Sequence, residues 1–367
     1  MKILAEELVM KNEGTMKEQK KKTRRKKDRP DYGVLDKLVI SKGYCCGCGV
    51  CVGVCPVQVI GYEALPKLIG ECIRCGRCSD ACPRGLAKII TNPHKEAVTD
   101  RLIGPYLNIL AGKTTKTEIL ERAQDGGAVT SILCACLESG YIDGAIVTRA
   151  DPERPWKPVP MIATTKEEII SAAGTKYHYP FEFSVLKKAT KELKLQSLSV
   201  VTRPCSTEGV RRLQQSRSKK SGKAIKLVVG LFCMEAFHTD FIDEVVAGGM
   251  ELSLSNIKKI NIKRDFVLTL DGGSLVNIPM EKAEPYIRTG CRFCSDFASE
   301  MADVSAGAVG TKNGWTTLIT RTDIGKEAVE IASNSGWLET REVSQKVLAT
   351  PHALAKRKKD RAIPILR

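Results

Sequence analysis

Two cysteine runs of identical spacing constrain this chain more than any other feature. CCGCGVCVGVCP spans residues 45–56, and ECIRCGRCSDACP spans residues 71–83. In both runs four cysteines follow the pattern C-x2-C-x2-C-x3-C, and a proline comes next. This is the spacing of bacterial proteins that hold two [4Fe–4S] clusters, in which the fourth cysteine of each run ligates the other cluster.

The crossed arrangement assigns eight cysteines to two clusters. The first cluster would be held by Cys45, Cys48, Cys51 and Cys82, and the second by Cys72, Cys75, Cys78 and Cys55. Glycines between the cysteines let the backbone approach the inorganic sulfides. Cys46 does not fit the spacing, and we interpret it as a bystander. Zinc ribbons, which use C-x2-C pairs closed by four ligands, are the alternative, but they do not contain two complete runs that each end in Cys-Pro.

The chain has 367 residues and 15 cysteines, and these numbers bear on its domain count and its cellular compartment. No apolar run approaches the ~18–20 residues of a membrane span. The first residues, MKILAEELVMKNEG, carry acids within their short apolar stretch, unlike a signal peptide. Cysteines without a secretion signal indicate metal ligation in a reducing compartment. We therefore expect a cytoplasmic protein of two or three domains, with the inner face of the membrane as an alternative location.

The formal net charge of +16 is concentrated near the two ends of the chain. Residues 17–29 contain nine basic and two acidic residues, and residues 354–367 contain six basic residues and one acidic residue. This distribution predicts solvated basic tails, with docking to an acidic partner or an anionic membrane surface as the alternative. Nucleic-acid binding is not expected, because no reading module or interleaved aromatic residues accompany the charge.

The motifs predict a ferredoxin domain of the bacterial two-cluster type, followed by an α/β domain with a mixed sheet. In the second part, β-branched runs at 197–204 and 224–232 alternate with helical patterns. A hairpin is expected around Asp271, Gly272 and Gly273. The predicted segments are a flexible basic arm (1–32), the ferredoxin domain (33–100), a linker (101–119), the α/β domain (120–345) and a basic C-terminal tail (346–367).

Four further cysteines stand where an α/β fold gathers ligands. Cys205 and Cys233 each follow a predicted buried strand, and ligands in open α/β sheets bind beyond the carboxyl ends of the strands. Together with the C-x2-C pair Cys291 and Cys294, they supply four thiolates. Four thiolates are enough for a third [4Fe–4S] cluster, and a zinc site is the alternative.

A glycine-rich turn precedes the predicted helix at 129–140. In QDGGAVTSIL, two glycines stand before the helix and two hydroxyl residues lie in its first turn: Gly126, Gly127, Thr130 and Ser131. Free N–H groups at a helix start can bind a phosphate, although such turns are also common without a ligand. Cys134 and Cys136 lie two residues apart on the same helix and are assigned to core packing.

Six motifs, in the same order along the chain, resemble those of the family of coenzyme F420 hydrogenase/dehydrogenase β subunits. The motifs are QDGGAVTSIL, AGTKY (173–177), RPC (203–205), GLFCMEAF (230–237), CRFCSDFASEMADVSAGAVG (291–310) and GWTTLITR (314–321). With the ferredoxin module in front, the chain is more similar to the input subunit of F420H2 dehydrogenases of methanogenic archaea than to the shorter hydrogenase β subunits.

The resemblance implies that residues 120–345 form a flavin-binding domain with FAD and one [4Fe–4S] cluster, which exchanges a hydride with coenzyme F420. By resemblance, the FAD diphosphate would lie at Gly126, Gly127, Thr130 and Ser131, and the flavin or deazaflavin at Gly174, Thr175, Lys176 and Tyr177. The cluster would be held by Cys205, Cys233, Cys291 and Cys294. Lys176 is assigned an electrostatic role in catalysis, with a solvated lysine as the alternative. The segment 202–206 departs from the Gly-x-Pro-Cys-Gln pattern of the family, and Arg203 within it adds a positive charge beside the cluster.

From the chemistry of these cofactors we expect electrons to pass from F420H2 through FAD and three [4Fe–4S] clusters to a partner protein. FAD is required because a deazaflavin exchanges hydrides and a cubane accepts one electron at a time. The expected partners are redox subunits of a hydrogenase, a formate dehydrogenase, a heterodisulfide reductase or a membrane dehydrogenase complex. The alternatives are the same module coupled to a reductase of sulfite, glutamate synthase or pigment type, or a flavin-free polyferredoxin that only transfers electrons.

Overall fold

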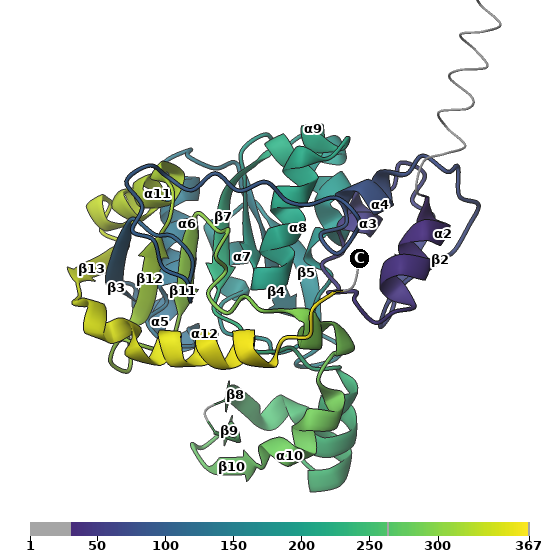
Figure 1. Ribbon diagram of the computed structural model, residues 1–367. Coiled ribbons are helices and arrows are strands. Elements are labelled where there is room, and N and C mark those ends of the chain that lie inside the picture. Colours follow the sequence, from purple (N-terminus) through teal and green to yellow (C-terminus); the bar gives the residue numbers. More distant parts are fainter. Residues whose placement is uncertain (1–30, 263, 366–367) are drawn as a thin grey trace, which may run out of the picture.

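The computed structural model describes residues 31–262 and 264–365. The predicted basic arm at 1–32 therefore lies outside the described residues, apart from its last two positions. Figure 1 shows a small N-terminal module, a large body built on one sheet, and a three-stranded lobe below the body. No helix within the described part of the chain has the length and apolar character needed to cross a membrane.

The body is built on an eight-stranded sheet, which is mixed as the sequence predicted. Its strands are, in spatial order, β13 (Leu338–Glu342), β3 (Asn108–Thr114), β12 (Thr316–Thr320), β11 (Val304–Gly307), β7 (Ile225–Leu231), β6 (Leu198–Thr202), β4 (Gly144–Ala150) and β5 (Pro158–Ala163). Neighbouring strands from β11 to β4 run parallel, and the remaining strands on both sides pair antiparallel. Because β6 and β7 are parallel, their carboxyl ends lie at the same edge of the sheet.

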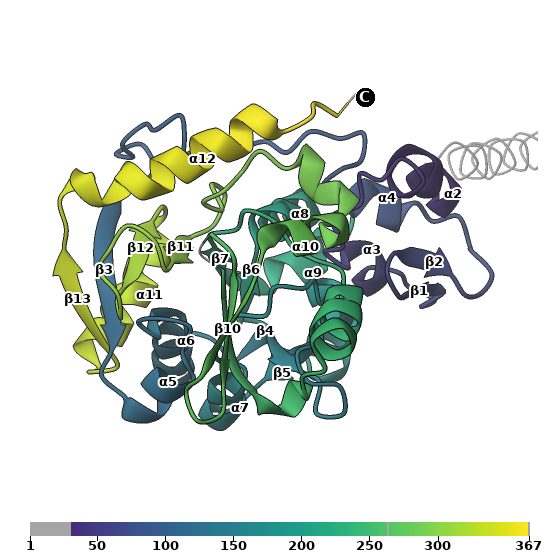
Figure 2. The same cartoon turned by 90° about the horizontal axis from the view of Figure 1, so that it is seen from below.

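Helices cover both faces of this sheet (Figure 2). One face carries α5 (Thr117–Arg122), α6 (Ala128–Glu138), α7 (Lys166–Ser171) and α11 (Asp323–Asn334), and the other carries α8 (Pro204–Gln215), α9 (Lys219–Lys223) and α12 (Ala349–Arg361). Alternation along β7 explains this arrangement, because successive strand residues point to opposite faces. Leu227 and Val229 pack in the core that contains α6 and α11, whereas Val228 packs in the core that contains α8.

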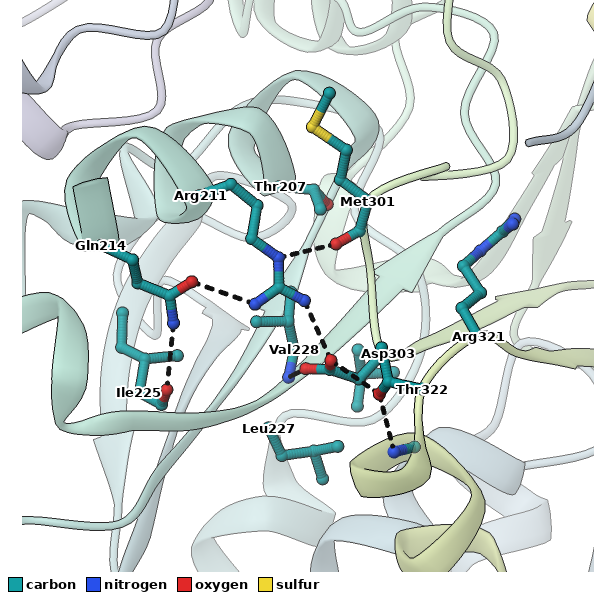
Figure 3. Close-up of polar contacts among 12 residues, drawn as sticks. Thr207, Arg211, Gln214, Ile225, Leu227, Val228, Met301, Asp303, Arg321 and Thr322 are labelled. Carbon is teal, nitrogen blue, oxygen red and sulfur yellow. Dashed lines mark hydrogen bonds and ion pairs between the residues drawn. The ribbon is translucent and has the colours of Figure 1, made fainter. Parts of the chain in front are cut away.

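A buried polar network fixes α8 against the centre of the sheet (Figure 3). The Arg211 guanidinium donates to Asp303 Oδ1 at 3.0 Å, and the Val228 N–H donates to Asp303 Oδ2 at 2.8 Å. The hydroxyl of Thr322, the N-cap of α11, also donates to Asp303 Oδ1, at 2.9 Å. Because α8 carries a predicted cluster ligand in its first turn, this network also positions that ligand.

We expect Asp303→Ala to lower the free energy of unfolding by about 3–5 kcal/mol, because removal of one partner of a buried ion pair leaves the other charge uncompensated. The Asp303 side chain is 3 % exposed and the Arg211 side chain 20 %, so the lower half of that range applies. Urea denaturation followed by circular dichroism measures the loss. The matched control is Asp360→Ala, which breaks an exposed pair with Lys356 and should change little. Equal losses of stability in the two variants would contradict a stabilising role for the buried Asp303–Arg211 ion pair.

The three-stranded lobe is an antiparallel sheet with its own aromatic core. It contains β8 (Ile257–Ile262), β9 (Phe266–Leu270), β10 (Leu275–Ile278), the short α10 (Met280–Ala283) and the π-helical segment Phe241–Gly248. Phe237, Phe241 and Phe266 pack together at its centre. The predicted hairpin is confirmed, because β9 and β10 pair across a turn in which Gly272 and Gly273 both have positive φ.

The N-terminal module contains the same local structure twice: a left-handed glycine followed by a short helix. It contains α2 (Tyr32–Leu35) with the π-helical turn Asp36–Ile40, α3 (Val50–Gly53), α4 (Arg77–Ala81), and the antiparallel pair β1 (Ile60–Tyr62) and β2 (Pro66–Leu68). Gly49 (φ 78°) precedes α3 and Gly76 (φ 71°) precedes α4, both in the left-handed conformation that glycine adopts without cost. Each cysteine run therefore passes through a loop into a short helix.

The module and the body share one apolar core. That core contains Val50, Val54 and Ala81 from the module and Val200 and Val228 from the sheet. The Phe183 N–H donates to the Cys48 carbonyl oxygen at 3.0 Å. A Cβ on Gly49 would lie 2.6 Å from the Phe181 carbonyl oxygen, which is closer than real Cβ contacts. The two parts are thus packed backbone against backbone.

The predicted linker at 101–119 is not a linker in the structure. It contains β3, which pairs with β12 on one side and β13 on the other. The segment NILAGKT has few β-branched residues and a central glycine, so its pattern does not indicate a strand. The glycine has a packing reason, because a Cβ on Gly112 would lie 2.6 Å from Leu318 Cδ1.

The predicted basic tail at 346–367 is also wrong for the described residues, because α12 occupies most of it. Leu348, Pro351, Ala355 and Lys358 are buried along one side of the segment. Their spacing of three or four residues is that of a helix face that packs on a protein. The charge density concealed this pattern, and one of the buried residues is itself a lysine, 2 % exposed.

Candidate functional site

The structure brings together the cysteines predicted for the second cluster. Cys55, Cys72, Cys75 and Cys78 line one cavity with about 300 Å³ of empty space, part of it open to solvent. Burial raises the pKa of Cys78 to about 12, and the neighbouring thiolates of Cys75, Cys72 and Cys55 add to the shift. Cys55 belongs to the first cysteine run and the other three to the second. Their shared cavity therefore supports the crossed assignment of ligands.

The cysteines predicted for the first cluster also lie together, deeper in the molecule. Burial raises the pKa of Cys82 to about 12, with a further contribution from Cys45. The pKa of Cys51 is raised well above its usual value, first by burial and then by Cys45 and Cys82. Cys82 belongs to the second run, so its proximity to Cys45 and Cys51 agrees with the predicted crossing. This set lies where the module meets the body, since Cys48 is part of their shared core.

The four remaining predicted ligands converge on a third cavity. Cys205 lies in the first turn of α8, Cys233 follows β7, and Cys291 and Cys294 lie in and just after the 3₁₀ turn Thr289–Phe293. All four line a cavity with about 330 Å³ of empty space. The sequence placed Cys205 and Cys233 at strand ends, and the parallel centre of the sheet is what brings those ends together.

Three basic side chains line the same cavity: Arg203, Arg288 and Lys358. Arg203 pairs with Glu182 at 2.7 Å. Lys358 has no carboxylate partner within the described residues and donates from Nζ to the Cys233 carbonyl oxygen at 2.5 Å. Burial would lower the pKa of Lys358, but the thiolates of Cys294, Cys233 and Cys291 raise it above its ordinary value. Only Arg203 was singled out from the sequence.

A fourth cation, contributed by the N-terminal module, lies near the thiols of this cavity without lining it. Arg84 is 8 % exposed and pairs with Glu208 at 3.2 Å, and its nearest charges include the thiolates of Cys294, Cys46 and Cys205. Arg84 Nε and Nη2 and Arg288 Nε are buried without a hydrogen-bond partner in the described part of the chain. Buried N–H groups of cations need an acceptor, so the cavity suits an anionic group.

The donor set fits a [4Fe–4S] cluster. A cubane with four thiolate ligands carries a net negative charge, and four thiols surrounded by cations provide both its ligands and its counter-charges. Over residues 31–262 and 264–365, no group of three or more His, Cys, Asp or Glu residues has the spacing of a single metal ion. Iron and zinc analysis of the purified protein decides between the cluster and the zinc alternative.

Cys46 was predicted to be a bystander, but the structure places it in the wall of the third cavity. Its side chain is buried, 6 % exposed. Cys134 and Cys136, by contrast, are fully buried in the core around α6, as the sequence indicated. No spacing rule could have found Cys46, because its cavity partners are more than 150 residues away in the sequence.

The motifs assigned to the flavin by resemblance also meet in space. Gln124 Oε1 accepts from the Thr175 N–H at 3.3 Å, and its Nε2 donates to Asn261 Oδ1 at 2.6 Å. Asp125 Oδ1 accepts from the Gly314 N–H at 2.6 Å. Residues from QDGG, AGTKY and GWTT therefore form one region beside β8. Gln124 and Asp125 hold this region together, and the sequence did not single them out.

The glycine-rich turn is closely packed, which limits which of its residues can face a ligand. A Cβ on Gly126 would lie 2.6 Å from the Gly112 carbonyl oxygen, and Gly127 has a φ of 70° where α6 begins. The Ser131 side chain is fully buried and donates to Thr114 Oγ1 at 2.7 Å. Ser131 therefore ties α6 to β3 and does not face a ligand, unlike its predicted role.

Lys176 is held by backbone carbonyls. Its Nζ donates to the carbonyl oxygens of Ala172 at 2.6 Å and of Ala173 and Gly174, both at 3.0 Å. Burial lowers the pKa of Lys176 to about 8. An ammonium group has three donors, and all three are used here to cap the end of α7. Lys176 is thus neither a solvated lysine nor free to bind an anion directly.

Tyr177 connects the flavin region to the third cavity. Its carbonyl oxygen accepts from the Phe237 N–H at 3.0 Å, and its ring lies edge-on to Phe266, with ring centroids 6.2 Å apart. The neighbouring Ala236 N–H contacts Cys291 Sγ at 3.4 Å. Two hydrogen bonds, linked through the Ala236–Phe237 peptide bond, therefore connect Tyr177 to a predicted cluster ligand.

Fold and cavities together define a class: an iron–sulfur protein in which a two-cluster module is docked on a mixed α/β body that has a cysteine site of its own. Comparison with protein families is more specific. The chain belongs to the family of coenzyme F420 hydrogenase/dehydrogenase β subunits, whose N-terminal domain matches residues 109–187 and whose C-terminal domain matches residues 195–346. A 4Fe-4S dicluster domain matches residues 44–87. The N-terminal family domain includes nearly all of β3, in agreement with its place in the sheet.

Three relatives illustrate what the chain is similar to. The chain is 35 % identical to the coenzyme F420 hydrogenase subunit beta of Methanothermobacter thermautotrophicus, over 66 % of this chain and 87 % of that protein. It is 33 % identical to the coenzyme F420-dependent sulfite reductase of Methanocaldococcus jannaschii, over 84 % of this chain and 49 % of the relative. It is 28 % identical to a subunit of the F(420)H(2) dehydrogenase of Methanosarcina mazei, over 79 % of this chain and 82 % of that protein.

The same relation holds in three dimensions. A chain of the F420-reducing [NiFe] hydrogenase complex from Methanosarcina barkeri superimposes with a TM-score of 0.69 and 34 % identity, over 72 % of this chain and 92 % of that chain. The match to the hydrogenase subunit covers about two thirds of this chain, whereas the matches to the sulfite reductase and to the F(420)H(2) dehydrogenase extend over about four fifths of it.

Proposed function

We propose that this protein exchanges a hydride with coenzyme F420 by means of bound FAD and passes single electrons through three [4Fe–4S] clusters to a redox partner subunit. Family membership and the names of the relatives support the link to F420. The observation that carries the proposed order of transfer is an unbroken series of contacts from the flavin region to the N-terminal module.

This series runs through the third cavity. From Tyr177 it passes by the Phe237 hydrogen bond and the Ala236 contact to Cys291. The residue before Cys291 then packs against the module, because a Cβ on Gly290 would overlap the Cys45 carbonyl oxygen. Cys45 is a predicted ligand of the first cluster. The flavin region, the third site and the first site are therefore consecutive neighbours.

Bound FAD would supply the conversion of one hydride into two single electrons, which the clusters accept one at a time. Gly126, Gly127 and Thr130 would lie against the diphosphate, at the start of α6. Gly174, Thr175 and Tyr177 would line the flavin or the deazaflavin. Lys176 would act through its positive charge and not through direct contact, because carbonyl oxygens occupy its donors.

Electrons would leave the protein at the second cluster site, since its cavity lies nearest the surface of the module. Cys72 and Cys75 are only half-buried. The surrounding apolar side chains are exposed, with Val57 at 42 %, Ile69 at 65 % and Ile73 at 56 %. Exposed apolar residues grouped around a site are typical of a surface that binds another protein. We place the redox partner subunit there.

The test is a cofactor count on anaerobically purified protein. We expect about twelve irons per chain, because each of three cubanes holds four, together with one FAD that F420H2 bleaches. Inductively coupled plasma spectrometry measures iron and zinc, and the absorbance of acid-released flavin measures FAD. Eight irons with one zinc would remove the third cluster from the proposal. Twelve irons without flavin would favour the flavin-free electron-transfer alternative.

A second candidate is electron supply to a sulfite-reducing partner. The match to the F420-dependent sulfite reductase extends over 84 % of this chain, which is more than the match to the hydrogenase subunit covers. The rest of that relative, about half of it, lies outside the match. F420H2-dependent formation of sulfide, measured with and without an added siroheme sulfite reductase, separates this candidate from the first.

A further inference from the structure

Cys46 contacts predicted ligands of two different clusters. Its Sγ lies 3.9 Å from the Cys205 carbonyl oxygen, and Cys46, Cys48 and Cys205 pack in one buried cluster. Cys205 is assigned to the third cluster and Cys48 to the first, so Cys46 lies between the two sites.

The backbone holds Cys46 firmly in this place. Gly290 is pressed against it, because a Cβ there would overlap the Cys45 carbonyl oxygen and lie 3.5 Å from Cys46 Cα. Arg288 Nη2 approaches the Cys45 carbonyl oxygen at 3.5 Å. Residues on the Cys291 loop therefore fix the Cys45–Cys46 backbone from the cavity side. A cysteine packed into the core at random would not line a cavity with four other cysteines.

We propose that Cys46 is a fifth thiol of the third iron–sulfur site, able to bind the same iron of the cluster as Cys205. The inference rests on the proposed third cluster. Because the Cys46 side chain lies against Cys205 in the wall of this cavity, either thiol would reach the same corner of a cubane. Exchange breaks the Fe–Sγ bond to Cys205, forms the bond to Cys46, and moves one proton from the Cys46 thiol to the Cys205 sulfur. No electron is transferred.

Alanine variants test this sharing, because alanine offers no ligand atom, whereas serine could bind iron through oxygen. Cys46→Ala and Cys205→Ala should each keep about twelve irons per chain, since one of the two thiols remains in either variant. The double variant Cys46→Ala/Cys205→Ala should keep about eight. The matched control is Cys233→Ala, which should also fall to about eight because Cys46 lies at the Cys205 corner.

Electron paramagnetic resonance of the reduced proteins gives a second readout, independent of activity. The signal of the third cluster should persist with altered g values in Cys205→Ala and disappear in the double variant. A count of eight irons in Cys205→Ala, with the signals of the other two clusters intact, would overturn the proposal. If Cys205→Ala does not fold, Cys46→Ala still decides the question, because an unchanged spectrum of the third cluster would show that Cys46 does not touch the site.

The wild-type protein separates this inference from the function on which it rests. Twelve irons in the wild type with eight in Cys205→Ala contradict only the role of Cys46. Eight irons already in the wild type contradict the third cluster itself. Cys46→Ala alone cannot distinguish a shared ligand from a bystander by iron count, which is why the double variant is required.

Discussion

On the proposed electron path, replacing Cys294 with alanine should leave the reduction of bound FAD by F420H2 near normal and reduce electron delivery beyond it to background. Cys294 is 4 % exposed, lines the third cavity and belongs to the body of the protein. Without a cluster there, electrons remain on the flavin, because the next site lies across the boundary between body and module. Stopped-flow absorbance measures flavin reduction, and the steady-state reduction of a partner protein measures delivery.

The companion variant is Cys75→Ala, at the second cluster site on the surface of the module. Here F420H2 should reduce both the flavin and the third cluster, and delivery to the partner should again be lost. The two variants thus interrupt one series at different points, and the difference is visible in the signal of the reduced third cluster. If Cys75→Ala failed to reduce its own FAD while its FAD content was normal, the serial order would be wrong. The module would then help to build the hydride site.

The second large effect concerns Lys358 on α12. Lys358→Met keeps most of the apolar stem but removes a buried charge beside Cys233. A hydrogen bond that involves a charged group contributes about 1.5–3 kcal/mol, and a tenfold change in a one-electron equilibrium corresponds to about 59 mV. Reduction adds negative charge to the cluster, so the lysine favours the reduced form. We therefore expect the midpoint potential of the third cluster to fall by about 60–130 mV.

The control for Lys358 lies two residues earlier on the same helix. Lys356 is exposed and pairs with Asp360 at 2.6 Å, so Lys356→Met removes the same charge without touching the cavity. A redox titration monitored by electron paramagnetic resonance should show no shift for this variant. Equal shifts in the two variants would mean that overall charge and not the local lysine sets the potential. Unchanged iron content in both variants is required before the potentials are compared.

The sequence predicted those parts of the site whose pattern lies within a short stretch of the chain. The two cysteine runs carry their ligand spacing within a dozen residues, and the structure places both crossed sets together. Cys205 and Cys233 could be found because each follows a β-branched run, and the end of a buried strand is a position that sequence patterns can locate. The fold class and the mixed sheet followed from the same alternation of strands and helices.

The remaining features could not be predicted because their cause is tertiary. Cys46 lines the third cavity only because Gly290 docks on its backbone. Lys358 is buried because α12 packs across the sheet, while the charges around it indicated a solvated tail. β3 lacks a strand-like composition and owes its conformation to pairing with two neighbours. Ser131 has a suitable hydroxyl for a phosphate, but the neighbouring Thr114 accepts its hydrogen bond.

The close docking of the N-terminal module also limits how such a protein can be rearranged. Gly49 and Gly53 lie against the carbonyl oxygens of Phe181 and Phe183, where a Cβ on either glycine would overlap the oxygen. Those glycines serve this particular body as well as the clusters that they border. The module is therefore not an interchangeable cassette: a two-cluster ferredoxin transplanted in its place would keep its own iron ligands yet lose the backbone fit that sets the distance to the third site.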